Sequence, residues 1–158
     1  MGLQNSAPSV TPRQRVLKPG QIQAIFEVFQ GIEPEPKGEL DYVNAYTLVV
    51  AVALSAQATD VSVNAATKAL FAKVTTPQQM LDLGEDALKD HIKTIGLYNA
   101  KAANVIKAAR ILVDDFGGEV PEDRAALESL PGVGRKTANV VLQMFWGHPT
   151  IAVDTHVF

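Results

Sequence analysis

Lys136 lies in a stretch that suits amine chemistry beside a phosphate group. Residues 130–139 read Leu-Pro-Gly-Val-Gly-Arg-Lys-Thr-Ala-Asn. Gly132 and Gly134 predict a tight turn that opens a helix, with backbone angles that Cβ-bearing residues disfavour. Such a turn directs backbone N–H groups outward at the positive end of the helix dipole, where phosphate binds. The same dipole disfavours a protonated amine in the first turn, which favours a nucleophile at Lys136.

Four short motifs occur in order along the chain. Residues 55–60 read Ser-Ala-Gln-Ala-Thr-Asp, residues 95–99 read Ile-Gly-Leu-Tyr-Asn, the glycine hairpin follows, and Asp154 lies in Val-Asp-Thr-His. From about residue 41 to its last residue, the chain resembles the endonuclease III branch of the helix–hairpin–helix DNA glycosylases. A hairpin alone would be weak support, whereas four ordered motifs with lysine in the nucleophile position favour the lyase-competent branch.

The resemblance implies a role for each motif. Lys136 would attack C1′ of a damaged nucleotide, and Asp154 would accept protons and stabilise the positive charge that develops on the sugar. The nucleotide must first leave the duplex. By resemblance, Gln57 fills the space it vacates and Leu97 wedges the opposite strand. The other DNA contacts implied are Gly132, Gly134, Arg135, Thr137 and His156.

Each proposed role has a plainer alternative. Lys136 would contact phosphate in a non-catalytic hairpin, and Asp154 would cap a following helix. Gln57 would be a loop amide and Leu97 a half-buried turn residue. The catalytic role also requires a neutral amine, which burial and the helix terminus would favour.

The chain contains no cysteine, which excludes disulfides and thiolate metal sites. Members of the family usually hold a [4Fe–4S] cluster with four cysteines near the C-terminus. The resemblance therefore implies a member that is truncated before the iron–sulfur region, and no cofactor is expected in these residues. The rest of the sequence shows neither a metal-ligand pair nor a hydrolase triad.

The composition is typical of a soluble globular protein, with 47% hydrophobic residues. No run approaches the ~20 apolar residues of a membrane span, and the first 12 residues lack the apolar core of a signal peptide. We expect a cytoplasmic, nucleoid-associated monomer without membrane contact.

The net charge of −3 is unusual for a protein that binds DNA, because phosphate contacts need cations. The charges are unevenly distributed, however. Residues 111–130 are mainly acidic, whereas residues 86–110 carry Lys89, Lys93, Lys101, Lys107 and Arg110. This pattern predicts one basic and one acidic side, although two ordinary solvated faces would explain it equally well.

Helical periodicity and turn residues predict an all-α fold without strands. We expect helices at about residues 21–30, 42–54, 60–72, 77–83, 85–94, 99–116, 121–130 and 135–146. The longest apolar stretch, residues 48–54, is expected to be a buried helix.

The resemblance implies the six-helix domain of these glycosylases with an incomplete second helical domain. The expected parts are a frayed arm (1–17), an N-terminal helix and linker of the second domain (18–37), the helical domain (38–150) with its hairpin at about 122–146, and the start of the missing C-terminal domain (151–158).

The resemblance implies a bifunctional DNA glycosylase and AP lyase. It would remove oxidised pyrimidines from double-stranded DNA and cleave 3′ to abasic sites by β-elimination through a lysine Schiff base. One alternative is a non-catalytic hairpin module, whose salt-dependent, lesion-blind affinity for DNA would survive Lys136→Ala. Another is a helical interaction domain or an inactive fragment, which would not bind DNA.

Overall fold

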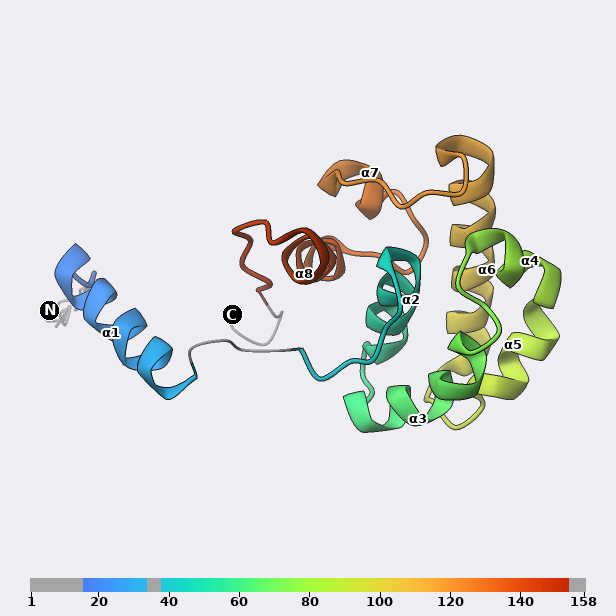
Figure 1. Ribbon diagram of the computed structural model, residues 1–158, viewed down its shortest axis with the longest axis horizontal. Helices are drawn as coiled ribbons and strands as arrows, with labels where there is room; N and C mark the ends of the chain where they lie inside the picture. Colours follow the sequence, from blue (N-terminus) through green and yellow to red (C-terminus); the bar gives the residue numbers. More distant parts are fainter. Residues whose placement is uncertain (1–15, 34–37, 154–158) are drawn as a thin grey trace, which may run out of the picture. The chain divides into compact units, whose positions relative to one another are not determined.

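The computed structural model describes residues 16–33 and 38–153 of the chain. Within these ranges the structure contains eight helices and no strand, which confirms the all-α fold (Figure 1). None of the described helices is both long and apolar enough to cross a bilayer. The helices are α1 (Pro19–Ile32), α2 (Ala45–Ser55), α3 (Asp60–Phe71), α4 (Pro77–Leu83), α5 (Glu85–Ile92), α6 (Tyr98–Phe116), α7 (Arg124–Glu128) and α8 (Arg135–Trp146).

The chain divides into two compact units, Met1–Lys37 and Gly38–Phe158. The first contains α1, which has proline at its first position, a residue whose fixed φ suits a helix start. No residue of α1 is buried, although it carries several large apolar side chains. The second unit contains the other seven described helices and the predicted site residues that the structure describes.

Helix α2 forms the centre of the second unit. Eight of its 11 residues are buried, which confirms a buried helix at residues 48–54. It packs against α3, α6 and α8. The helix begins at Ala45, three residues later than predicted, because the Asn44 side chain accepts a hydrogen bond from the Thr47 N–H at 2.9 Å and so caps it.

The long helix α6 supports the rest of the unit. It packs against α4 and α5, while α3 packs against α5 and α7 against α8 (Figure 1). Its C-terminus lies at Gly117, which adopts a left-handed φ of 63° as expected of a C-terminal glycine. Fully buried leucines from α2, α3, α5 and α6 meet in one core.

Several predicted helix boundaries were wrong by a few residues. The helix expected at residues 121–130 is only Arg124–Glu128, because the Asp123 carboxylate caps it by accepting from the Ala126 N–H at 2.8 Å. Leu97, in the turn that precedes α6, has a left-handed φ of 60° and is the N-cap of that helix.

Candidate active site

A cavity of about 620 Å³ lies where the end of α2 meets the start of α8. Lys136 and Thr137 line it from α8, and Gln57 lines it from the link between α2 and α3. Two predicted site residues from distant motifs, the candidate nucleophile and the candidate space-filling residue, therefore share one cavity. Its other lining residues are Gly38, Glu39, Leu40, Val52, Ser55, Ala56, Asp60, Val140 and Met144.

The hairpin before α8 is anchored in the core. Leu127, Leu130 and Val133 are all at least 95% buried, and the Val133 N–H donates to the Leu130 carbonyl at 3.0 Å. These contacts fix the direction in which α8 begins. The glycines on either side of Val133 are exposed on the outer side of the turn.

The two hairpin glycines have different roles. Gly132 has φ 80°, and a Cβ there would lie 3.2 Å from the Asn104 Cβ, so both the backbone angle and the space favour glycine. Gly134 has φ −91° and ψ 179°, angles open to any residue, so the expectation of a glycine-only backbone was wrong there. A Cβ at Gly134 would meet nothing within 4 Å, which leaves the approach to the helix open.

Gly134 is the N-cap of α8 and offers no side chain to the first-turn amides. Arg135, Lys136 and Thr137 are the first three helical residues, at the positive end of the dipole. The Arg135 side chain is 72% exposed, with its Nε 3.8 Å from a Glu128 carboxylate oxygen. Because exposed pairs of this kind contribute little, this pair holds the Arg135 side chain only weakly.

Lys136 is exposed at the cavity. The expectation that Lys136 is buried is therefore wrong for the chain alone.

Gln57 and Leu97 share an uncommon backbone conformation. They are the two non-glycine residues with positive φ in the described part of the chain, at 56° and 60°. The Leu97 side chain is 66% exposed rather than half-buried, and it lies outside the cavity at the N-terminus of α6. Strained, exposed positions of this kind are common where a protein meets a ligand.

Asp154 and His156 lie outside the described residues. The segment that leads to them is held on α8, one helical turn from Lys136. The Asn139 amide donates to the Ile151 carbonyl at 3.3 Å, and the Thr150 hydroxyl donates to the Asn139 carbonyl at 2.7 Å.

Asp60 lines the cavity but was not among the predicted site residues. The N-cap of α3 is Thr59, whose hydroxyl accepts from the Ser62 N–H at 3.2 Å. Asp60 then lies in the first turn of α3 and lines the cavity with Lys136. Its place in the motif at residues 55–60 was the signal that could have identified it.

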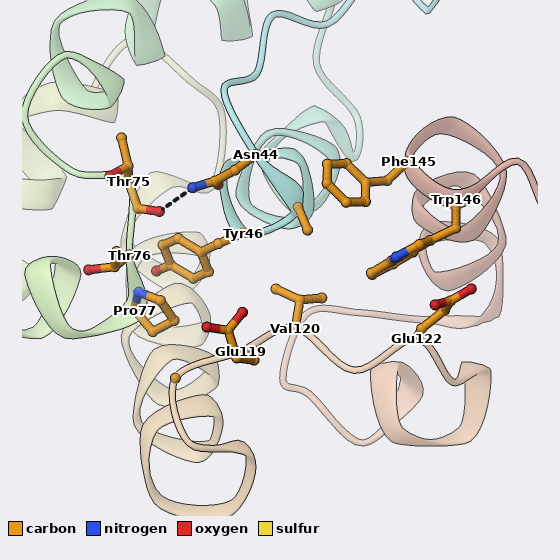
Figure 2. A pocket seen from close by; sticks show the side chains of 12 residues that line it. Asn44, Tyr46, Thr75, Thr76, Pro77, Glu119, Val120, Glu122, Phe145 and Trp146 are labelled. Atoms are coloured by element: carbon orange, nitrogen blue, oxygen red, sulfur yellow. Dashed lines mark hydrogen bonds between the residues drawn. The ribbon is translucent and has the colours of Figure 1, made fainter.

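A second cavity, of about 460 Å³, lies at the opposite ends of α2 and α8 (Figure 2). Tyr46, Glu119, Glu122, Phe145 and Trp146 are among its lining residues, and it contains none of the predicted site residues. The end of α2 meets the start of α8 at the first cavity, and the start of α2 meets the end of α8 at the second. The two helices therefore run antiparallel, and the two cavities lie one helix length apart.

Tyr46 is an unusual core residue beside this second cavity. It is 95% buried, and its hydroxyl has no hydrogen-bond partner. Burial raises the pKa of Tyr46 well above its ordinary value, because the phenolate would lose its hydration.

The residues present do not fit an iron–sulfur cluster. Such clusters are held mainly by cysteine thiolates, and the sequence has no cysteine. Residues 16–33 and 38–153 also contain no group of three or more His, Cys, Asp or Glu residues able to hold a metal ion.

The chain is similar to several known proteins. A profile of the HhH-GPD superfamily base excision DNA repair proteins matches residues 50–158. The endonuclease III of Escherichia coli (strain K12) is 62% identical over 125 residues, which cover 79% of this chain and 59% of that protein. The endonuclease III of Rickettsia conorii is 58% identical over 137 residues, covering 87% of this chain and 65% of that protein.

A solved structure, of a trapped endonuclease III–DNA covalent intermediate, matches with a TM-score of 0.83 and 46% identity. The match covers 90% of this chain and 67% of that chain. The chain spans about three fifths of the length of the two curated relatives. These matches confirm the resemblance, and the chain belongs to the HhH-GPD superfamily of base excision DNA repair proteins, in its endonuclease III branch.

Proposed function

We propose that this chain carries the helical catalytic domain of a bifunctional DNA glycosylase and AP lyase. Its substrate is double-stranded DNA with damaged bases or abasic sites. The observation that carries the proposal is the cavity shared by Lys136, at the start of α8, and Gln57. A covalent endonuclease III–DNA intermediate among its solved relatives supports a covalent step in this chain as well.

The chemistry begins at the amine of Lys136. The neutral amine attacks C1′ of the nucleotide, and the base leaves with the electron pair of the glycosidic bond and takes up a proton that the amine gives up. The C1′–O4′ bond of the sugar then opens: O4′ takes up a proton from solvent, and the nitrogen lone pair forms the iminium at C1′. This iminium makes the 2′ proton acidic. Loss of that proton expels the 3′ phosphate and cleaves the strand by β-elimination. On an abasic site the same amine forms the iminium with loss of water.

Asp154 is proposed as the carboxylate that accepts protons and stabilises positive charge on the sugar. Ile151, which Asn139 holds on α8, precedes it by three residues, a span of at most ~11 Å. The chain length therefore permits Asp154 to reach the same cavity. A cap by Asp154 on a following helix would be compatible with this role.

DNA would be held by the hairpin and opened by two turns. Amides near Gly132 and Gly134 would bind phosphate, with contacts from Arg135, Thr137 and His156. Gln57 would fill the space of the extruded nucleotide, and Leu97 would wedge the opposite strand. The resemblance implies oxidised pyrimidines as the lesions and a monomeric protein in the cytoplasm, at the nucleoid.

Borohydride trapping tests the proposal. Borohydride reduces a lysine imine to a stable amine, so a duplex with one abasic site should become covalently attached to the parent chain. Lys136→Ala should form no adduct, whereas Lys73→Ala, which removes an exposed lysine at the end of α3, should form the parent's amount.

Two outcomes would overturn the proposal. An adduct of normal yield in Lys136→Ala would remove Lys136 as the nucleophile. The absence of an adduct in all three proteins, together with salt-dependent binding that ignores the lesion, would indicate a non-catalytic hairpin module.

A further inference from the structure

The loop that presents Gln57 is a strained β-turn. The Ala58 N–H donates to the Ser55 carbonyl at 3.0 Å, which closes a four-residue turn. Ala56 has φ −56° and ψ 118°, and Gln57 has φ 56°. These angles define a type II turn, whose third residue is ordinarily glycine because it needs positive φ.

A type I turn would relieve this strain at the same chain length. The two types differ by a flip of the central peptide, here the one between Ala56 and Gln57. In type I the third residue has negative φ, which a glutamine adopts without strain. The flip also reverses the direction of the Ala56 carbonyl. Some contact must therefore hold that carbonyl in the type II orientation.

Lys101 makes this contact from α6. Its ammonium nitrogen lies 2.7 Å from the Ala56 carbonyl oxygen and 2.9 Å from the Leu54 carbonyl oxygen. Carbonyls at the end of a helix lack intrahelical partners, and a cation there is favoured by the dipole. Both carbonyls belong to the end of α2, so Lys101 caps this helix from a distant element.

Lys101 also lies next to the second strained turn. Its backbone N–H donates to the Leu97 carbonyl at 3.0 Å, the first hydrogen bond of α6. One residue thus contacts the Gln57 turn through its side chain and the Leu97 turn through its main chain. The two turns belong to different sequence motifs, and Lys101 contacts both of them.

These contacts distinguish Lys101 from a DNA-facing cation. From the sequence, Lys101 was expected to be one of the basic residues of segment 86–110 that form a positively charged side. Lys101 is instead half-buried, and two of its three ammonium donors are used by carbonyls. Partial burial also lowers its pKa, as expected for an ammonium group that has lost water.

We propose that Lys101 is a positioning residue that selects the type II turn at residues 55–58 and so directs Gln57 toward the DNA. It acts through Gln57 and touches neither substrate nor reacting atoms. The inference rests on the proposed function for the role of Gln57, but the turn itself can be tested without DNA.

The first experiment measures the turn by NMR in the DNA-free chain. A type II turn brings the Ala56 Hα close to the Gln57 amide proton, whereas type I brings the two amide protons close together. Lys101→Met should lose the first contact and gain the second. The control Lys107→Met removes an exposed lysine from the same helix and should keep the parent pattern.

Lys101→Gln provides a second variant without the ammonium group, for use if the methionine variant does not fold. Retention of the type II contact in a folded Lys101 variant would overturn the proposal, whether or not the chain acts on DNA. A parent chain with the type II turn but no imine trapping would instead contradict the proposed function alone.

The second experiment compares imine trapping on two abasic substrates. In duplex DNA the nucleotide must be extruded, whereas in a single strand this cost is largely absent. Lys101→Met should trap duplex DNA about tenfold more slowly, as expected for the loss of a charge-assisted hydrogen bond, and single-stranded DNA at the parent's rate. An equal loss on both substrates would indicate general damage to the fold and contradict a positioning role.

The salt dependence of DNA affinity distinguishes a positioning role of Lys101 from a direct contact with phosphate. A lysine that contacts phosphate contributes about 0.9 to the slope of log affinity against log salt concentration. Lys101→Met should leave this slope unchanged. A decrease of about one unit would identify Lys101 as a phosphate contact and overturn the proposal.

Discussion

Alanine at Gly132 should destabilise the fold, whereas alanine at Gly134 should leave its stability nearly unchanged, because the hairpin uses the two glycines differently. Gly132 has φ 80°, and a Cβ there lies 3.2 Å from the Asn104 Cβ. The left-handed conformation costs an alanine ~1–2 kcal/mol. The smaller unfolded-state entropy of alanine returns ~0.4–1 kcal/mol. We therefore expect Gly132→Ala to lose about 1 kcal/mol of unfolding free energy, more if Asn104 cannot shift.

Gly134→Ala should leave stability nearly unchanged. Its angles suit alanine, and a Cβ meets nothing within 4 Å. Alanine is a poorer N-cap than glycine, by roughly 0.5 kcal/mol, and the entropy gain of alanine offsets this loss. The added methyl would nevertheless stand at the first-turn amides of α8, so we expect weaker binding of DNA.

Urea unfolding followed by far-UV circular dichroism measures the first effect, and fluorescence anisotropy with an abasic duplex measures the second. For a unit of about 120 residues, 1 kcal/mol corresponds to a melting-temperature decrease of roughly 3–6 °C. If both variants were equally stable, or if Gly134→Ala were the less stable one, the positive φ of Gly132 would not be the reason for glycine there.

Two further substitutions test strained or unsatisfied positions. Tyr46→Phe removes a buried hydroxyl that has no partner, so urea unfolding should show a gain of about 1 kcal/mol, and a clear loss would mean that the hydroxyl is satisfied. Burial raises the pKa of Tyr46 in the folded state, so the contribution of this residue to the free energy of unfolding is constant below the unfolded pKa of about 10. Above that pH the unfolded chain loses the phenol proton first, and the free energy of unfolding decreases. The parent should therefore lose more stability than Tyr46→Phe as the pH rises above about 10. Leu97→Gly relieves a left-handed φ of 60° at a residue that is 66% exposed, so stability should be equal or higher, while imine trapping on duplex DNA should slow. Unchanged trapping on the duplex would remove Leu97 from the DNA-opening role.

Much of the fold was readable from the sequence because its signals are local. Thr59 and Thr76 cap α3 and α4 through their own hydroxyls, and Gly117 ends α6. The apolar composition of α2 predicted its burial. The late starts of α2 and α7 also have local causes, since the side-chain caps of Asn44 and Asp123 compete with propensity over a few residues.

By itself, the sequence determined the all-α fold, the family, and the residue types that could do chemistry, because turns, caps and motifs act over a few neighbouring residues. Only the tertiary structure decided which of them meet. The antiparallel packing of α2 on α8 brings Gln57 and Asp60 to Lys136, and the packing of α6 converts Lys101 from an apparent surface cation into a cap on α2. The left-handed backbone at Gln57 and Leu97 also has no signal in the sequence, because neither residue type favours it.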